Sequence, residues 1–314
     1  MANNEFSIDA LVPAEMARKA ETIGTKKAGM EFWEMFALAV LAGAFIALGA
    51  IFSTTVSAGS IAIKTAEGTP AFSSGLPYGV VRLLAGLSFS LGLILVIVGG
   101  AELFTGNNLI IMAFTSGKVT FKQLIRNWII VYVGNFVGSI ATAVLMFLTK
   151  QYMFGNGTIG LNVLNIGEAK TSLEFGQAIA LGIMCNALVC LAVWLCFSAR
   201  STIDKILSII FPITAFVAAG FEHSIANMYF IPIAIFIKNW GDPALFELIK
   251  KSPVDFPHLT WGNFFIGNLL PVTIGNIIGG AFMVGLVYWF IYLRNVEKPT
   301  PTNRESRKWT EQGE

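Results

Sequence analysis

Two stretches of sequence, NWIIVYVGNFVG at Asn127–Gly138 and NLLPVTIGNIIG at Asn268–Gly279, repeat the same N-x6-G-N-x2-G spacing. Both lie in apolar segments long enough to cross a bilayer, whose hydrocarbon core is about 30 Å thick. The chain is 55% hydrophobic and 13% charged, whereas soluble domains usually carry about 25% charged residues. The sequence therefore predicts a polytopic membrane protein built from two copies of one unit.

Apolar segments predict six membrane spans, at about residues 35–52, 79–100, 128–148, 178–197, 206–220 and 264–292. Two shorter apolar pieces, Asn108–Phe114 and Ile225–Phe236, follow the second and fifth spans after polar interruptions. At about 1.5 Å per residue, such pieces reach only half way through the bilayer. We therefore expect an all-α membrane protein with six transmembrane helices, of which helices 2 and 5 are broken at the midplane.

The polar interruptions are AELFTGN (Ala101–Asn107) and FEHSIAN (Phe221–Asn227), which place Glu and Asn at the same spacing. Each repeat holds three spans, so its copy must insert upside down, which predicts an inverted 3+3 repeat. Irregular backbone at this depth is tolerated only where it is buried in protein or lines a cavity. The pattern favours a substrate path between the repeats. Two glycine-kinked helices in a packed bundle would not account for polar residues at both breaks.

The distribution of basic residues predicts the orientation. Two thirds of the 21 Lys and Arg residues lie in the termini and in the loops after spans two and four, so the positive-inside rule places both termini in the cytoplasm. We expect an N-terminal segment at residues 1–30, a channel domain at 31–295 and a tail at 296–314. Residues 1–30 lack the apolar core of a signal peptide. Val12–Gly24 predicts a short amphipathic helix, either an interfacial cap or a gate over the pore.

The sequence carries no fingerprint of an enzyme. There is no Ser/His/Asp ordering, no metal-ligand spacing, no Walker motif and no dinucleotide fingerprint. Cys185, Cys190 and Cys196 lie in one apolar stretch and are interpreted as small core residues. No dense basic run indicates nucleic-acid binding. We therefore expect no enzymatic activity, no cofactor, no metal and no nucleic-acid partner.

The two breaks predict an anion site. A broken helix exposes backbone N–H groups at the start of its second half, where the macrodipole is positive. Two such starts entering from opposite faces favour an anion and oppose a cation. Thr105 and Ser224 add hydroxyl groups, and His223 lies at the second break, so we interpret His223 as a pore residue. His258 lies in a polar loop and is expected at the surface.

The roles of two pairs of polar residues, the acids and the asparagines near the breaks, each allow two interpretations. Glu102 and Glu222 either accept hydrogen bonds from the freed backbone N–H groups or act electrostatically on the passing ion. Asn135 and Asn276 lie within the GxxxG spacings, which are expected to allow close helix packing. Their amides either bond a neighbouring helix or line the pore.

AELFTGN, FEHSIANMY and the two Gly-Asn pairs resemble the formate–nitrite transporter family over roughly residues 15–295. The resemblance implies an aquaporin-like protomer in a homopentamer of the bacterial inner membrane, with one pore per protomer. It implies that Thr105 and His223 meet at the pore centre. It further implies a set of nearby pore residues (Asn186, Asn276), a vestibule lysine that draws anions (Lys170), and apolar constrictions at Phe89, Phe104 and Phe216 on one side and Leu93, Leu103 and Val189 on the other.

The resemblance points to formate as the substrate, with protons and membrane lipid as further partners. Formate should have an acid strength near that of Asp, so protonating it at pH 7 costs roughly 4 kcal/mol. A bare anion in a narrow apolar constriction faces a larger desolvation penalty. We expect His223 to donate a hydrogen bond or, transiently, a proton. Nitrite or hydrosulfide conduction is the alternative; an aquaporin or glycerol channel and a membrane-embedded enzyme fit the residues less well.

Overall fold

The computed structural model describes residues 9–59, 62–64, 70–73 and 76–294. Within these ranges six helices are long and apolar enough to cross a membrane, which confirms the predicted number of spans. They are α2 (Phe32–Val56), α3 (Tyr78–Gly99), α6 (Phe121–Leu148), α8 (Phe175–Ser198), α9 (Thr202–Ala219) and a continuous helix at Asn263–Tyr292. The last one contains two π-helical segments, as η4 (Asn263–Leu269), α12 (Leu270–Ile277), η5 (Ile278–Leu286) and α13 (Val287–Tyr292).

Shorter elements connect the spans. They are α1 (Pro13–Ala28), β1 (Ala62–Lys64), β2 (Pro70–Ser73), α4 (Phe104–Asn107), η1 (Asn108–Ile110), α5 (Ile111–Thr115), η2 (Gln151–Met153), α7 (Thr158–Thr171), α10 (Ser224–Trp240), α11 (Pro243–Ile249) and η3 (Pro253–Asp255). The antiparallel hairpin β1–β2 and helices α7 and α11 are absent from the sequence-based prediction, because hydropathy detects only segments of spanning length. The expected tail at 296–314 lies outside the described residues.

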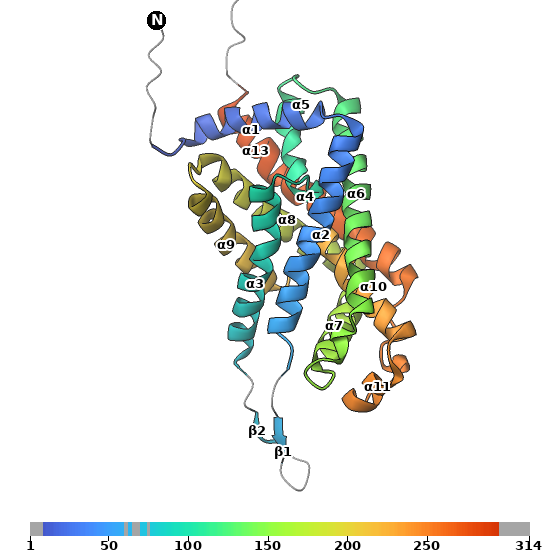
Figure 1. The fold of residues 1–314 in the computed structure, drawn as a ribbon. Helices are drawn as coiled ribbons and strands as arrows, with labels where there is room; N and C mark the ends of the chain where they lie inside the picture. The colour runs from blue at the N-terminus through green and yellow to red at the C-terminus, as the bar shows by residue number, and fades with distance from the viewer. Residues whose placement is uncertain (1–8, 60–61, 65–69, 74–75, 295–314) are drawn as a thin grey trace, which may run out of the picture.

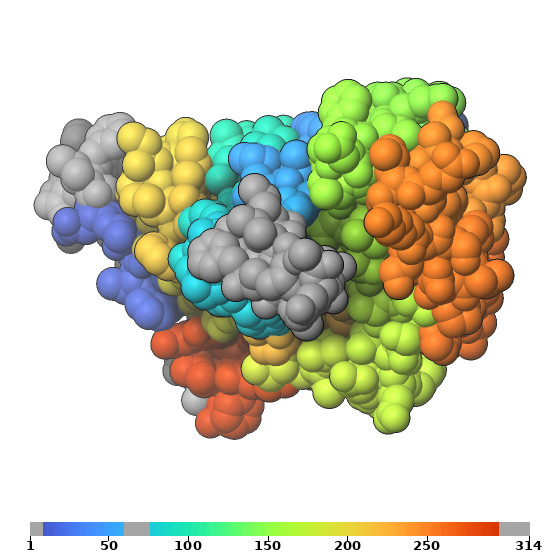
Figure 2. All heavy atoms as spheres, turned by 90° about the horizontal axis from the view of Figure 1, so that it is seen from below, coloured from blue at the N-terminus to red at the C-terminus, as the bar shows by residue number. Residues whose placement is uncertain are grey.

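The helices form one upright bundle with two distinct ends (Figure 1). The end that carries α1 and α13 is called the terminal face, and the end that carries β1–β2 and α11 is called the hairpin face. Figure 2 shows the hairpin face, where the loop after α6 lies beside the segment around α11. Lys150 and Asp242 form an exposed ion pair of 3.0 Å between these two segments.

Close helix packing joins the first and third spans of each repeat. A Cβ at Gly138 of α6 would lie 1.9 Å from the Val40 carbonyl oxygen of α2, and one at Gly279 would lie 2.1 Å from the Ile183 carbonyl oxygen of α8. Only glycine permits such an approach between backbones, as the GxxxG spacing predicts. The two repeats also touch directly. Tyr132 Oη and Thr273 Oγ1, which hold the same position in the repeated motif, lie 2.8 Å apart, so the pseudo-two-fold axis passes between them.

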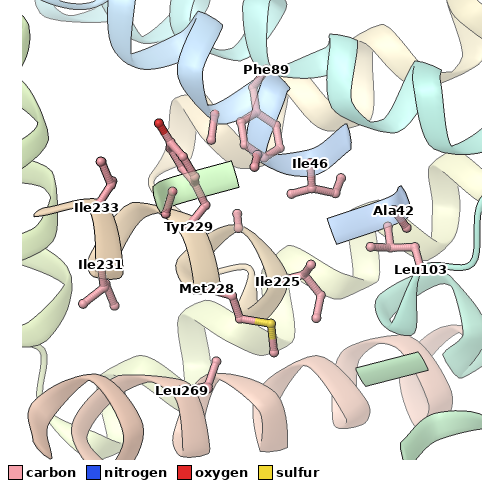
Figure 3. Close-up of a cluster of buried hydrophobic side chains, with 14 of the residues drawn as sticks. Ala42, Ile46, Phe89, Leu103, Ile225, Met228, Tyr229, Ile231, Ile233 and Leu269 are labelled. Atoms are coloured by element: carbon pink, nitrogen blue, oxygen red, sulfur yellow. The ribbon is translucent and has the colours of Figure 1, made fainter. Parts of the chain in front are cut away.

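A buried apolar cluster surrounds the breaks. Figure 3 shows part of it, in which Ile46 of α2, Phe89 of α3 and Ile225 of α10 come from three separate segments. Each of these side chains is at most 3% exposed. Burial of this kind holds the broken segments against the intact spans, so the polar groups at the breaks occupy fixed positions in an apolar surrounding.

Candidate functional site

Two short irregular segments interrupt the bundle. Helix α3 ends at Gly99 and α4 begins at Phe104, while α9 ends at Ala219 and α10 begins at Ser224. Each interruption starts with a glycine in the left-handed region, Gly100 at φ 79° and Gly220 at φ 77°, a conformation that most L-residues avoid. The breaks are confirmed but are shorter than predicted, because the Thr-Gly-Asn and Ser-Ile-Ala-Asn parts already belong to the second helices.

Asn135 and Asn276 satisfy the backbone at the breaks. Asn135 Oδ1 accepts from the Phe104 N–H at 3.0 Å, and its Nδ2 donates to the carbonyls of Ala39 and Glu102 at 2.7 and 2.9 Å. Asn276 repeats this arrangement with the Ser224 N–H at 2.9 Å and with the carbonyls of Gly182 and Glu222 at 2.8 and 3.0 Å. Both side chains are fully buried. Of the two interpretations, the structure therefore shows bonding to neighbouring segments.

The acids at the breaks are ion-paired. Glu102 lies 2.8 Å from Lys27 Nζ and accepts from Asn107 at 2.7 Å. Glu222 lies 2.7 Å from Lys170 Nζ and accepts from Asn227 at 2.6 Å. In the described residues neither carboxylate accepts from a freed backbone N–H, so that interpretation is wrong for both. The hydrogen bonds of Asn135 and Asn276 already serve the first N–H of each second helix, and the acids turn toward the lysines instead.

The lysines define two matching networks. Lys27 lies in the last turn of α1 and Lys170 in the last turn of α7, so α1 and α7 hold equivalent places in the two repeats. Asn127 and Asn268, the first residues of the repeated motif, accept from Asn107 and Asn227 at 3.0 and 2.7 Å. Sequence analysis missed this role, although the repetition of Asn at both motif starts was the available signal. Helix α1 is thus bonded to the first break in the same way that α7 is bonded to the second.

Thr105 and His223 meet between the two breaks, as the resemblance implies. Thr105 Oγ1 lies 3.0 Å from His223 Nε2, and both side chains are buried. His223 Nδ1 accepts a hydrogen bond from the Ala226 backbone N–H at 3.1 Å. A backbone N–H can only donate, so the neutral ring carries its proton on Nε2 and presents it toward Thr105.

Asn186 supports this centre from α8. Its Nδ2 lies 3.3 Å from the Thr105 carbonyl, 3.0 Å from Asn108 Oδ1 and 2.7 Å from the Asn276 carbonyl. The side chain is fully buried, and it links the two breaks through their backbones. Asn186 therefore positions Thr105 by holding the carbonyl of the same residue.

A cavity lies on each side of the centre. The terminal-side cavity, of about 270 Å³, is lined by residues that include Lys19, Lys27, Leu93, Leu103 and Lys205. The hairpin-side cavity, of about 300 Å³, is lined by residues that include Arg82, Phe89, Lys170, Phe216, Glu222 and His223. Of the residues of the expected constrictions, Leu93 and Leu103 thus line the terminal-side cavity, and Phe89 and Phe216 line the hairpin-side cavity.

Aromatic rings close the hairpin side of the centre. The Phe216 ring stacks on the His223 ring at 5.9 Å and meets Phe89 edge-on at 5.6 Å. Phe104, which the resemblance groups with these two, instead packs edge-on against Tyr132 at 4.9 Å. Val189 lies in the buried core on α8, 1% exposed. Neither Phe104 nor Val189 is among the residues that line the two described cavities.

Two opposed helix breaks, joined by a polar pair and opening into a cavity on each side, define a multi-pass membrane transport protein. Residues 14–290 match the model of the formate/nitrite transporter family. The chain therefore belongs to the formate/nitrite transporter family, whose members are transporters rather than enzymes.

Individual relatives match over nearly the whole chain. The chain is 46% identical over 293 residues to the formate channel FocA of Escherichia coli K12, covering 93% of this chain and 98% of that one. It is 40% identical over 284 residues to FocA of Haemophilus influenzae, covering 90% and 95%. A solved structure described as a pentameric formate channel with formate bound shares 46% identity, with a TM-score of 0.76, and covers 84% of this chain and 98% of that one.

Proposed function

We propose that this protein conducts formate through the paired breaks, as a homopentamer in a bacterial inner membrane with cytoplasmic termini. The observation that carries the proposal is the contact of Thr105 Oγ1 with His223 Nε2. This contact lies between two cavities that are both lined in part by lysine or arginine side chains. The terminal face is then cytoplasmic and the hairpin face is outside. Similarity to formate channels supports formate over nitrite or hydrosulfide.

The mechanism follows from the polarity of the path. An anion is drawn into either cavity by lysine and arginine side chains and then meets apolar constrictions, where an unpaired charge is strongly disfavoured. At the centre, the Nε2–H of His223 and the hydroxyl of Thr105 replace hydrogen bonds that the ion loses with water. Charge-assisted hydrogen bonds of this kind contribute about 1.5–3 kcal/mol each. The site therefore lowers the barrier at the narrowest part of the path.

The tautomer bears on how protons take part. A positively charged ring would carry a second proton on Nδ1 and would lose the bond from the Ala226 N–H. The geometry supports His223 as a hydrogen-bond donor through Nε2.

The function is tested by a substrate panel. Purified protein in liposomes is compared for flux of formate, nitrite, hydrosulfide, acetate, lactate, glycerol and water at two pH values. We expect formate to pass fastest and glycerol and water to pass no faster than through protein-free liposomes. Glycerol flux without formate flux would contradict the proposal and favour a neutral-solute channel.

A substitution at His223 tests the central site. We expect His223→Asn to lower formate flux about tenfold or more, because the amide cannot reach Thr105 and the ion with the same geometry. If the ring acts by hydrogen bonding, the flux that remains keeps the wild-type dependence on pH. Stopped-flow flux between pH 5 and pH 8 measures both quantities. Loss of the pH dependence would assign proton transfer to the ring, and an unchanged rate would remove His223 from the mechanism.

A further inference from the structure

Arg82 binds the end of the first half of the second broken helix. It lies in the second turn of α3, and its Nε donates to the Ala218 carbonyl at 3.2 Å. Its Nη2 donates to the Val217 carbonyl. These carbonyls belong to the last turn of α9, after which no further helical N–H follows; the Val217 carbonyl also accepts a hydrogen bond from the Gly220 N–H at 3.1 Å. The negative end of the α9 dipole therefore faces a guanidinium group.

This contact lies in the path of an anion. Arg82, Val217 and Gly220 line the hairpin-side cavity together with Phe216 and His223. An anion that enters there meets two sources of negative potential, the Glu222 carboxylate and the end of α9. Lys170 neutralises the carboxylate at 2.7 Å. Arg82 offsets the helix end, so each of the two sources of negative potential in the vestibule is paired with a cation.

The guanidinium group also has donors left for a ligand. It carries five N–H groups in a planar fork. In the described part of the chain its bonds go to the two α9 carbonyls, through Nε and Nη2, and leave the Nη1 donors available. Arg82 is half-buried beside an apolar wall of Phe216 and Phe89. The remaining edge of the guanidinium, formed by one N–H of Nη1 and the second N–H of Nη2, offers two parallel hydrogen bonds to a planar anion.

In the described residues, the end of α3 in the other repeat lacks a basic side chain equivalent to Arg82. Both helix ends are closed in the same way by backbone N–H groups, those of Gly100 and Ala101 on the Val96 carbonyl and those of Gly220 and Phe221 on the Phe216 carbonyl, so the difference lies in the side chains. Among residues 76–294 and the earlier described ranges, no Lys or Arg side chain is recorded on the final carbonyls of α3. On that side Lys19 donates to the Phe197 carbonyl at 2.8 Å, and Lys27 pairs with Glu102. The two vestibules therefore differ in their cations.

We propose that Arg82 forms an anion-docking site in the hairpin-side vestibule, which binds a small monocarboxylate before the Phe89–Phe216 constriction. The inference deepens the proposed function and rests on it for the identity of the ligand. The site binds a carboxylate through the guanidinium fork, while Lys170 remains paired with Glu222. Arg82 is a binding residue, distinct from the central Thr105–His223 pair.

The test uses benzenesulfonate, a permanently charged anion too wide for the constriction. Added on the hairpin side of liposomes, it should block formate flux, and Arg82→Gln should raise the half-blocking concentration about tenfold. Arg82→Lys, which keeps the charge and loses the fork, should fall between wild type and Arg82→Gln. Block from the terminal side should be the same in all three. Lys150→Gln removes another hairpin-face cation outside this cavity and should leave both concentrations unchanged.

The outcomes separate docking from helix capping and from the proposed function. A cap alone would let Arg82→Gln lower the maximal flux and thermal stability while the half-blocking concentration stays at the wild-type value, which would overturn the docking site. Absence of formate flux in wild type would overturn the proposed function instead. In that case, calorimetry still measures the binding of benzenesulfonate to the purified protein. Equal affinity in wild type and Arg82→Gln would then overturn the docking site.

Discussion

Glu222→Gln is expected to destabilise the protein by about 3 kcal/mol, because it leaves the largely buried Lys170 ammonium without a counter-ion. The Lys170 side chain is 16% exposed and that of Glu222 is 5% exposed. Glutamine has the same shape as glutamate but brings an N–H₂ group into a site of donors. That group must face either Lys170 or the amides of Asn227 and Asn268, which donate to Glu222 Oε2 at 2.6 and 3.2 Å.

The double variant Lys170→Met/Glu222→Gln should be more stable than Glu222→Gln alone. Without the ammonium, the glutamine amide can turn its nitrogen to the vacated side and keep its oxygen toward the asparagines. The measurement is the temperature at which the folded peak disappears in size-exclusion chromatography. The single variant Lys170→Met is measured as well. If the melting temperature of the double variant were lower than that of Glu222→Gln by as much as Lys170→Met alone lowers it in wild type, the two side chains would not be coupled.

The exposed pair of Lys150 and Asp242 is the matched control. A hydrogen bond from Lys150 holds the pKa of Asp242 below its usual range, so the pair is ionised at pH 7. Solvent screens an ion pair at such a position. Asp242→Asn should therefore leave the melting temperature unchanged at pH 7. It removes a carboxylate that lies 3.0 Å from its lysine, a distance comparable to the 2.7 Å between Glu222 and Lys170.

Gly138→Val is expected to prevent assembly of the first repeat. A Cβ at Gly138 would meet the Val40 carbonyl oxygen at 1.9 Å, which is far inside van der Waals contact. The obstacle is backbone on a facing helix, so no side-chain rotation relieves it. Either α6 moves away from α2 or the chain fails to fold. Because Asn135 lies three residues away on α6, such a shift would also break its bonds at the first helix break.

Gly176→Ala is the control for helical glycine itself. A Cβ at Gly176 of α8 meets no atom within 4 Å, so alanine should leave the protein folded and raise its stability slightly. Expression of folded protein and formate flux are the two measurements. Wild-type yield and flux in Gly138→Val would show that the α2–α6 contact is not required.

Sequence patterns predicted the architecture well because the relevant signals run along the chain. Hydropathy over about 20 residues reports a span, and repeated spacing of Asn and Gly reports two copies of one unit. The short second halves and the polar interruptions placed both breaks close to their observed positions. Helix α7 was not predicted, because its 14 residues are too few to cross the membrane and include polar side chains.

The partners of the polar residues could not be predicted in the same way. Glu222 and Lys170 are 52 residues apart in sequence, and Asn135 reaches the Glu102 carbonyl across 33 residues. The resemblance groups Phe104 with Phe89 and Phe216, but the structure packs it against Trp128 and Tyr132 instead. These neighbours belong to another helix, so the sequence around Phe104 does not indicate them.

The sequence alone determined six spans, an inverted repeat and a histidine at a midplane break, since length, polarity and spacing carry that information. Only the tertiary structure decided that the asparagines hold the breaks together, that the acids are neutralised by lysines, and that His223 presents Nε2–H. Each of those depends on distances of about 3 Å between distant segments, and a hydrogen bond or ion pair exists only at such distances.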